Sequence, residues 1–350
     1  MALPVAAWSQ DLPAAAEIVE AFAFADVKWA GPETPVKAEP GKTLVIVALT
    51  MNSVSNQRVA AGIQEAAAKL GWQTTLVNSE GNIDKFAAGI DTAVTTGADG
   101  IALMGTLYVP QALERAREAA IPIVGSIDTT ENPFFAQGYY AHMVAERGVE
   151  IGAAAAAQLV VDLGAETPVA LFAAAPGDPL GDLLVQGAKQ VLEGAGNPIL
   201  AELSLEFPEL GTGTIGQKAV AAVQANPQIG AFWVSWDAPA SEIVTAFRNA
   251  GIDLPVYSTY GDPQNIDFIR NGQLQKADVL IPLEWAGYAV VDNFVRIFAG
   301  QPLAADAPDG VPIKLLNTQN LDAVLPEGST EWDGGFDFRT RYETLWGLGS

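Results

Sequence analysis

The chain contains the same strand–loop–helix pattern twice. Residues 43–71 read TLVIVALTMNSVSNQRVAAGIQEAAAKLG, and residues 168–196 read PVALFAAAPGDPLGDLLVQGAKQVLEGAG. Each begins with an apolar run, continues through a polar loop and ends in a segment with helical spacing. Gly62 and Gly187 fall at matching places in the two predicted helices. The repeat predicts two copies of one folding plan.

Apolar strands and amphipathic helices alternate around each copy. After Lys42 the pattern predicts strands over 43–49, 73–79, 100–105 and 121–128, and helices over 56–70, 84–96 and 110–120. In the second copy, PQIGAFWVSWD supplies the third strand. Fully apolar strands separated by helices are typical of a parallel sheet covered on both faces. We therefore predict an α/β protein of two similar doubly wound, parallel-sheet lobes.

The expected boundaries divide the chain into four parts. They are an N-terminal extension and linker (1–41), an N-terminal lobe (42–141 plus 282–310), a C-terminal lobe (142–281 plus 311–325) and a C-terminal tail (326–350). The extension carries one amphipathic stretch over about 13–24. The tail holds five aromatic residues, a composition atypical of disorder. We expect it to dock on the body, with a partner-binding tail as the alternative.

Composition excludes several classes of function. The 350 residues contain 18 Lys and Arg against 41 Asp and Glu, a formal net charge of -23, and this charge repels nucleic acid. The absence of cysteine excludes disulfides, thiolate chemistry and iron–sulfur clusters. The start, MALPVAAW, lacks the pattern of a signal peptide. We therefore expect either a cytosolic protein or one whose export signal has been removed.

The polar loops after the predicted strands are the candidate binding region. In open parallel sheets, ligands bind beyond the carboxyl ends of the strands, where the strand order reverses. Six loops leave the strands there: 50–56, 104–108, 126–130, 175–182, 234–239 and 258–263. They combine polar, aromatic and glycine residues, which fits a site that both hydrogen-bonds and stacks on a ligand.

An ordered set of segments resembles the type I periplasmic binding proteins of the ribose- and galactose-binding group. It comprises TLVIVALTMNSVSNQRVAAGIQEAAAKLGW, GIALMG, IPIVGSID, NPQIGAFWVSWDAPASEIVTAFRNAG and PVYSTYGDPQNIDFIRNGQLQKADVLIPLEWAGYAVVDNFVRIFAG, between about residues 42 and 300. The resemblance implies two lobes joined by three crossovers, a ligand held between them, and delivery to an ABC permease.

The resemblance also implies positions for ligand contacts. In the first loop, Asn52, Ser53 and Asn56 stand where the family has an amide and aromatic residues. Asp128 matches the carboxylate after the fourth strand. The family's arginine on the first helix of the second lobe has no counterpart, and Asp182 lies in that region. Loss of this arginine argues against a carboxylate or phosphate ligand.

The second lobe departs further from the family pattern. Trp236-Asp237 replaces an Asn-Asp pair, and Tyr260 and Gly261 fall in the place of a Phe-Asp-Gly triplet, with Asp262 one step beyond. The family's glutamine in the last crossover is also replaced, and Glu284 and Trp285 follow nearby. The sugar-reading groups are therefore largely exchanged.

These residues predict the class of ligand. Trp236, Tyr260 and Trp285 offer flat apolar faces to a sugar ring. Four carboxylates offer acceptors to hydroxyl groups or to a cationic nitrogen: Asp128, Asp237, Asp262 and Glu284. We expect a small neutral sugar or polyol, with a cationic or amine solute as the alternative.

Several of these residues also have a structural interpretation. Asp237 and Asp262 stand where each could cap a following helix, and one of Asn52 and Asn56 is expected to do so. Trp285 could be core packing. His142 falls at the expected first crossover, where it is a candidate hinge residue or a structural histidine.

Catalysis and DNA binding are disfavoured. His142 is the only histidine, which leaves little for Ser-His-Asp chemistry. The segment GTGTIG lacks the ending of a phosphate loop and predicts a turn into a helix over 215–225. Asp237 and Asp262 could form a glycosidase pair, but the fold argues against it. Lactose-repressor-type regulators share this fold, yet residues 1–41 contain only Lys28 and Lys37 as basic residues.

We therefore expect a binding protein that is not an enzyme and has no cofactor and no metal. Its expected partners are a small-molecule ligand and an ABC permease, with a sensory receptor subunit of the same fold as the alternative. We expect a monomer that is periplasmic or otherwise extracytoplasmic, with a lipid anchor on the precursor left open.

Overall fold

The chain forms two compact units. The structure, a computed structural model, describes residues 14–174, 177–301, 303 and 309–348. Unit 1 comprises Met1–Lys28, Arg147–Ile281 and Ile313–Trp332, and unit 2 comprises Trp29–Glu146, Pro282–Pro312 and Asp333–Ser350. Within the described ranges, no helix has the length and apolar character that a membrane span requires.

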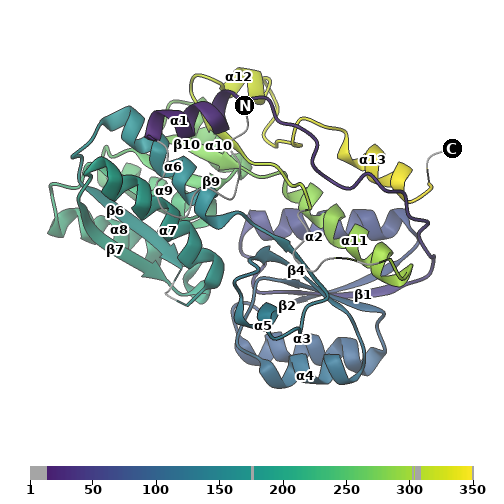
Figure 1. The fold of residues 1–350 in the computed structure, drawn as a ribbon. Coiled ribbons are helices and arrows are strands. Elements are labelled where there is room, and N and C mark those ends of the chain that lie inside the picture. Colours follow the sequence, from purple (N-terminus) through teal and green to yellow (C-terminus); the bar gives the residue numbers. More distant parts are fainter. Residues whose placement is uncertain (1–13, 175–176, 302, 304–308, 349–350) are drawn as a thin grey trace. The chain divides into compact units, whose positions relative to one another are not determined.

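Unit 2 is built on a five-stranded parallel sheet. Its strands are β1 (Thr43–Ala48), β2 (Gln73–Asn78), β3 (Gly100–Met104), β4 (Ile123–Asp128) and β5 (His142–Ala145), in the spatial order β2-β1-β3-β4-β5. Figure 1 shows α2 (Val54–Lys69) and α11 (Leu283–Phe298) on one face, and α3 (Ile83–Thr96) and α4 (Pro110–Glu118) on the other. The short helix α5 (Pro133–Ala136) follows β4.

Unit 1 repeats this plan and adds an antiparallel edge strand. Its strands are β6 (Val169–Ala174), β7 (Ile199–Leu205), β8 (Ala231–Val234), β9 (Val256–Tyr260), β10 (Gln275–Leu280) and β11 (Lys314–Asn317), in the order β11-β10-β9-β8-β6-β7. Its larger helices are α6 (Gly148–Leu163), α7 (Pro179–Ala195), α8 (Thr214–Ala225), α9 (Asp237–Ala250) and α10 (Pro263–Arg270). A 3-10 turn (Phe207–Glu209) follows β7.

The two sheets have the same topology. In each unit the first strand lies between the second and the third, followed by the fourth and the fifth. β1, β3, β6 and β8 are buried almost throughout because helices cover both faces of a parallel sheet. The predicted pair of doubly wound lobes is confirmed.

Close helix packing explains the matching glycines of the repeat. In each unit, the helix after the first strand packs against a helix that begins just after the chain enters that unit: α2 against α11, and α7 against α6. A Cβ at Gly62 would lie 2.4 Å from the carbonyl oxygen of Glu284, and one at Gly187 would lie 2.0 Å from that of Val149. The partner helices also contribute a glycine, Gly287 or Gly152, at the same approach. The backbones therefore approach too closely for any side chain.

The chain passes between the two units five times. Three passages, at 146/147, 281/282 and 312/313, correspond to the crossovers that the resemblance implies. The other two, at 28/29 and 332/333, arise because each terminal segment is divided between the units. The structure thus adds two crossings that the sequence did not predict.

The N-terminal segment begins in unit 1. The expected amphipathic stretch forms α1 (Ala15–Val19), which continues into a π-helical turn (Glu20–Phe24). α1 packs on α6 through the buried side chains of Ile18 and Val19. Beyond Trp29 the segment belongs to unit 2.

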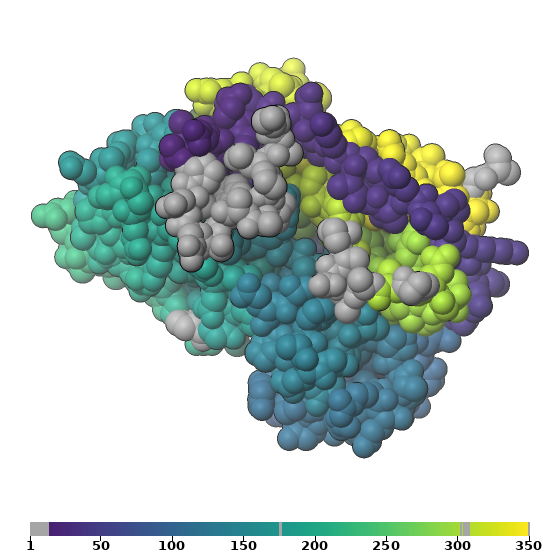
Figure 2. Space-filling view, in the orientation of Figure 1, coloured from purple at the N-terminus to yellow at the C-terminus, as the bar shows by residue number. Residues whose placement is uncertain are grey.

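In unit 2, the N-terminal segment lies between the C-terminal tail and α11 (Figure 2). The Val36 N–H donates to the carbonyl oxygen of Leu345 over 2.8 Å, and Arg296 of α11 donates to that of Thr34 over 3.0 Å. The short helix α12 (Leu321–Val324) precedes the tail in unit 1, and the tail contributes α13 (Phe338–Leu345) in unit 2. The α13 segment buries Phe338, Tyr342 and Trp346.

Candidate functional site

Each unit has a switch point at the carboxyl edge of its sheet. The strand order reverses between β1 and β3 in unit 2, and between β6 and β8 in unit 1. Loops that leave neighbouring strands at such a point diverge and leave room for a ligand. The candidate residues therefore fall into two sets, one for each unit. The expected loop over 175–182 is described only from residue 177 onward, and residues 175–176 lie outside the described residues.

The first set begins where β1 meets α2. Ser53 is the N-cap residue of α2, but its side chain makes no capping hydrogen bond. Its hydroxyl is buried and has no hydrogen-bond partner. Buried hydroxyls almost always have a partner, so this one needs an explanation. The unpaired Ser53 hydroxyl, at the start of the helix after β1, is therefore a candidate hydrogen-bonding group for a ligand.

The two asparagines of this loop do not cap the helix, which corrects the sequence prediction. The Asn56 amide donates to the carbonyl oxygen of Thr50 over 2.7 Å, and Asn56 is nearly buried. Asn56 therefore holds the loop in shape. Asn52 is exposed, and its backbone N–H donates to the Thr50 hydroxyl over 3.1 Å. Asn52 thus provides an exposed polar side chain in this loop.

Asp128 ends β4 and is held by its own unit. Its Oδ2 accepts from the Thr106 hydroxyl over 2.7 Å and from the Asn132 amide over 2.6 Å, and its Oδ1 accepts from the Thr129 N–H over 2.8 Å. Burial raises the pKa of Asp128 above its ordinary value, while these hydrogen bonds act in the opposite direction. Asp128 fixes the geometry of three neighbouring loop residues.

An exposed aromatic ring lies beside this loop set. Tyr108, in the loop after β3, is 73% exposed and stacks on Phe134 with ring centroids 5.4 Å apart. Phe134 itself is buried, so it supports one face of the tyrosine ring. Tyr108 was not among the predicted ligand-binding residues, although its loop was.

In unit 1, Trp236 and Ser235 follow β8. Trp236 is half-buried, and its ring lies 6.2 Å from that of Phe207. The Ser235 hydroxyl is fully buried and has no hydrogen-bond partner, while the Ser235 carbonyl oxygen accepts from the Thr259 hydroxyl over 2.6 Å. Unit 1 thus also holds an unpaired buried hydroxyl after a strand, although Ser235 directly follows its third strand and Ser53 lies at the start of the helix after the first strand of unit 2.

Asp237 and Asp262 meet in a buried polar cluster behind Trp236. Asp237 is the first residue of α9 rather than its cap, and its Oδ2 accepts from the Asp262 N–H over 2.6 Å. Its Oδ1 accepts from the Ser258 hydroxyl. Asp262 is the N-cap residue of α10, as predicted, but without a side-chain capping bond.

The cluster contains a third carboxyl group, that of Asp278 on β10. Its Oδ1 accepts from the Gly261 N–H over 3.2 Å, and Gln275 donates to its Oδ2 over 3.3 Å. Burial, followed by the charges of Asp278 and Asp262, raises the pKa of Asp237 well above its ordinary value. The cluster therefore favours a protonated form of Asp237 and fixes the backbone of Gly261 and Asp262, which follow Tyr260.

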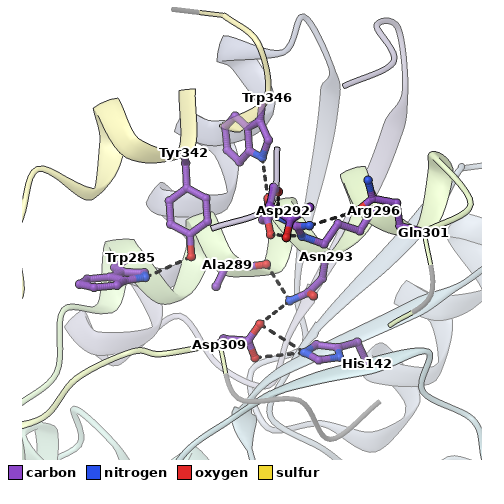
Figure 3. A network of polar contacts seen from close by, with 11 residues as sticks. His142, Trp285, Ala289, Asp292, Asn293, Arg296, Gln301, Asp309, Tyr342 and Trp346 are labelled. Carbon is purple, nitrogen blue, oxygen red and sulfur yellow. Dashed lines mark hydrogen bonds and ion pairs between the residues drawn. The ribbon is translucent and has the colours of Figure 1, made fainter. Parts of the chain in front are cut away.

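The remaining predicted residues have structural partners. Asp182 is exposed in the first turn of α7 and accepts from the Gly177 N–H over 3.2 Å. Glu284 forms a paired ion bridge with Arg58, at 2.8 and 3.0 Å. Trp285 is fully buried and donates to the Tyr342 hydroxyl over 3.1 Å (Figure 3).

His142 begins β5 in unit 2. Figure 3 shows its ring beside Asp309, with Nε2 3.1 Å from Oδ2. Asn293 of α11 donates to the same carboxylate over 2.6 Å. These contacts tie β5 and the segment before Pro312 to α11. The residue lies four positions before the passage at 146/147.

Sequence reasoning missed Asp278, Ser235 and Tyr108. A signal existed for Asp278, because QKADVL places a carboxylate in an otherwise strand-like segment. Ser235 and Tyr108 both lie in the candidate loops. The lack of a partner for the Ser235 hydroxyl and the exposure of the Tyr108 ring depend on residues that are distant in the sequence, so the sequence could not show them. Within the described chain, no group of His, Asp or Glu side chains is arranged to hold a metal ion.

The two doubly wound units and their polar strand-end loops define a class of α/β binding protein. The sequence matches the family model described as a periplasmic binding protein domain over residues 45–302, so the chain belongs to this family. The resemblance seen in the sequence is confirmed. No curated protein matches the sequence.

Solved structures share the fold at low sequence identity. A sugar ABC transporter protein from Yersinia enterocolitica superposes with a TM-score of 0.75 at 16% identity, covering 89% of this chain and 96% of that one. A solute-binding protein from Agrobacterium vitis with bound allitol gives 0.73 at 22% identity, covering 81% and 98%. An ABC sugar transporter subunit from Rhodobacter sphaeroides gives 0.70 at 21% identity, covering 80% and 99%.

Proposed function

We propose that this protein is an extracytoplasmic solute-binding protein that binds a small neutral hydroxylated ligand, a sugar or a polyol. The observation that carries the proposal is the pair of buried, unpaired hydroxyls of Ser53 and Ser235, each in a segment that follows a sheet strand of its own unit. A buried hydroxyl without a partner costs about 1–3 kcal/mol. Neither oxygen is accessible in this structure, so a ligand hydroxyl would remove this cost only when the surrounding loops move to admit it. Related folds hold comparable molecules, since two similar structures carry bound allitol and D-allose.

The charge of the loops favours a neutral ligand over an anion. The six strand-end loops contain no Lys, Arg or His. Arg58, in the helix that follows the first of these loops, is already paired with Glu284. A phosphate or carboxylate ligand would meet no cation there.

The partners of the acidic residues disfavour a cation as well. Asp128, Asp182 and Glu284 each accept hydrogen bonds from their own unit. Burial also raises the pKa of Asp237 well above its ordinary value, which disfavours the negative charge that a cation would need there. The cationic or amine ligand of the sequence analysis is therefore the weaker alternative.

Aromatic rings supply the apolar part of the proposed site. Tyr108, which stacks on Phe134 in unit 2, and Trp236, which follows Ser235 in unit 1, each leave part of an aromatic ring exposed. A sugar offers both an apolar ring face and hydroxyl groups, and the combination of stacking and hydrogen bonding suits it. Asn52 adds an exposed amide that can donate and accept.

The proposed role in the cell is delivery of the bound ligand to an ABC permease. Family membership supports it, and a sensory receptor subunit is the alternative. We further propose a monomer outside the cytoplasmic membrane, with or without a lipid anchor on the precursor. Ligand contacts with both units would favour a closed arrangement of the two, which the partner then recognises.

A thermal-shift panel followed by calorimetry tests the proposal. We expect sugars or polyols to raise the melting temperature, because a ligand at 100 times its Kd adds about 2.7 kcal/mol to stability. Trp236→Ala and Tyr108→Ala should each weaken binding by about tenfold or more. Leu163→Ala, which removes an exposed apolar side chain at the end of α6, serves as the control.

Two results would refute the assignment. A response to amines alone would replace the neutral ligand by a cationic one. Near-wild-type affinity of Trp236→Ala for the ligand found would remove Trp236 from the site.

A further inference from the structure

The two terminal crossings leave unit 1 from one apolar cluster. Val27, two residues before Trp29, packs against a cluster that contains Trp332 and Leu280. Trp332 stands directly before the passage at 332/333, and Val27 and Leu280 stand one residue further from the passages at 28/29 and 281/282. Lys314, just after the passage at 312/313, donates to the carbonyl oxygen of Ala25 over 2.8 Å. Four of the five passages are therefore linked on the unit 1 side.

The same segments meet again in unit 2. Trp29 stacks on Trp285 with ring centroids 4.6 Å apart and planes 18° apart, and Phe336 meets both rings edge-on. The Arg341 guanidinium lies 4.6 Å from the centre of the Trp29 ring. Tyr342 also meets the Trp29 ring edge-on, so this ring contacts one residue after the 281/282 passage and three from the tail.

Glycines allow the backbones to approach at these places. A Cβ at Gly310 would lie 2.1 Å from the carbonyl carbon of Ala30, and one at Gly334 would lie 2.8 Å from the Trp285 ring. Gly310 precedes the passage at 312/313, and Gly334 follows the one at 332/333. The N-terminal segment therefore contacts the chain before the passage at 312/313, and the tail contacts the Trp285 ring on which Trp29 stacks.

The tail is itself fixed to α11. Figure 3 shows Trp285 donating to the Tyr342 hydroxyl, and Trp346 donating to Asp292 over 2.8 Å. Arg339 of α13 pairs with Glu65 of α2 at 2.9 Å. On the unit 1 side, Arg270 donates to the carbonyl oxygens of Leu325 and Ser329, both over 3.1 Å.

The anchors on the two sides are separated by very little chain. Two residue steps join Val27 to Trp29, and two join Trp332 to Gly334. Fully extended chain spans roughly 3.5 Å for each residue, so each link reaches at most about 7 Å. We propose that residues 27–29 and 332–334 form a double strap that limits how far the two units can move apart. In this proposal the three family crossovers act as the hinge, and the strap sets the largest distance by which the two units can separate.

This inference goes beyond the proposed function and does not depend on the identity of the ligand. It concerns the movement of the ligand-free protein, and it can therefore fail while the ligand assignment stands. A failed ligand screen would equally leave it intact.

Lengthening the chain at both links, 27–29 and 332–334, tests the strap. The variant carries about ten Gly/Ser residues between Lys28 and Trp29, and the same number between Trp332 and Asp333, with a root-mean-square span of roughly 17 Å for each insert. All anchoring contacts keep their residues. Because the chain has no cysteine, Glu118→Cys in unit 2 and Glu193→Cys in unit 1 place two spin labels at exposed positions without further changes.

Pulsed electron resonance then reports the distance distribution between the labels without ligand. We expect its upper limit to move outward by roughly 5–15 Å in the slackened protein. The control carries the same insert between Ala165 and Glu166, an exposed loop within unit 1, and should match the parent protein. An unchanged distribution in a slackened protein with native circular dichroism would overturn the proposal.

Two single-insert variants and a side-chain variant guard against misfolding of the double variant. Each single insert should give a smaller outward shift than both together. Trp29→Ala removes the unit 2 anchor without lengthening the chain and should also shift the limit outward. If every folded member of this set gives the parent distribution, the strap does not exist.

Discussion

Ile127 and Tyr260 occupy corresponding ends of the fourth strand of the two units, and both have positive φ angles, 52° and 102°. β-branched and aromatic residues rarely adopt this conformation, which costs about 1–3 kcal/mol. At each position the backbone turns just before Asp128 or Gly261. Strain of this type concentrates at functional sites, and its repetition supports the fourth-strand ends as parts of the proposed binding region.

Because its backbone is strained, Ile127 should tolerate substitution by a polar residue with little loss of stability. Ile127→Asn should change the free energy of unfolding by less than about 1 kcal/mol, since asparagine accepts a positive φ and the relieved strain offsets the lost apolar contact. Ile123→Asn, at a buried position of the same strand, should cost about 3 kcal/mol or more. Urea denaturation of both variants measures the difference. Equal losses would show that Ile127 is not strained.

The approach of α7 to α6 predicts opposite effects for two glycines of one helix. Gly187→Ala should destabilise the protein by about 2–3 kcal/mol, because the new Cβ would lie 2.0 Å from the Val149 carbonyl oxygen. Gly194→Ala, in the same helix with no atom within 4 Å of the new Cβ, should stabilise it by about 0.5–1 kcal/mol. Thermal unfolding of the two variants gives both signs, and a stabilised Gly187→Ala would refute the packing argument.

The buried carboxyl cluster predicts a stability that falls with pH. The pKa of Asp237 is raised in the folded state above its ordinary value of 3.8. Above pH 3.8 the folded protein therefore binds more protons at this site than the unfolded chain, and stability decreases as pH rises toward the folded pKa.

Asp237→Asn should flatten this decrease, since the amide stays uncharged and can still accept from the Asp262 N–H. The measurement is chemical denaturation at a series of pH values. Asp253→Asn, at an exposed position of the same unit, is the control. A variant with the slope of the parent protein would show that Asp237 does not carry the effect.

Because the Ser53 hydroxyl is unpaired, its removal should affect the stability of the ligand-free protein and ligand binding in opposite directions. Ser53→Ala should leave the ligand-free protein as stable or up to about 1 kcal/mol more stable, because it removes an unsatisfied polar group, and it should weaken binding of the proposed ligand. Ser79→Ala provides the contrast, since its hydroxyl donates to the carbonyl oxygens of Ala48 and Leu49 at 2.8 and 2.7 Å.

Ser79→Ala should cost about 1–3 kcal/mol, because it leaves buried carbonyl groups with one partner fewer. Calorimetry with the ligand found in the panel, together with melting temperatures, measures both variants. A Ser53→Ala protein that is clearly destabilised would mean that its hydroxyl already has a partner.

Periodicity and spacing were enough to predict the repeated α/β plan, the strand-end loops and the matching glycines Gly62 and Gly187. These features can be read from short stretches of sequence, because the burial of one or both faces of a helix or strand determines its pattern of apolar residues. The same information placed Ser53 and Trp236 at strand ends. It also showed that the loops carry no basic residue.

Only the tertiary structure decided which polar groups are already satisfied. Asp128 and Asp237 are engaged by Thr106 and Ser258, and Trp285 is covered by Trp29 and Tyr342 from opposite ends of the chain. These contacts join residues that are distant in sequence, and no local pattern encodes a distance of this kind. The division of both terminal segments between the units depends on the same long-range packing, which a linear pattern of apolar and polar residues cannot specify.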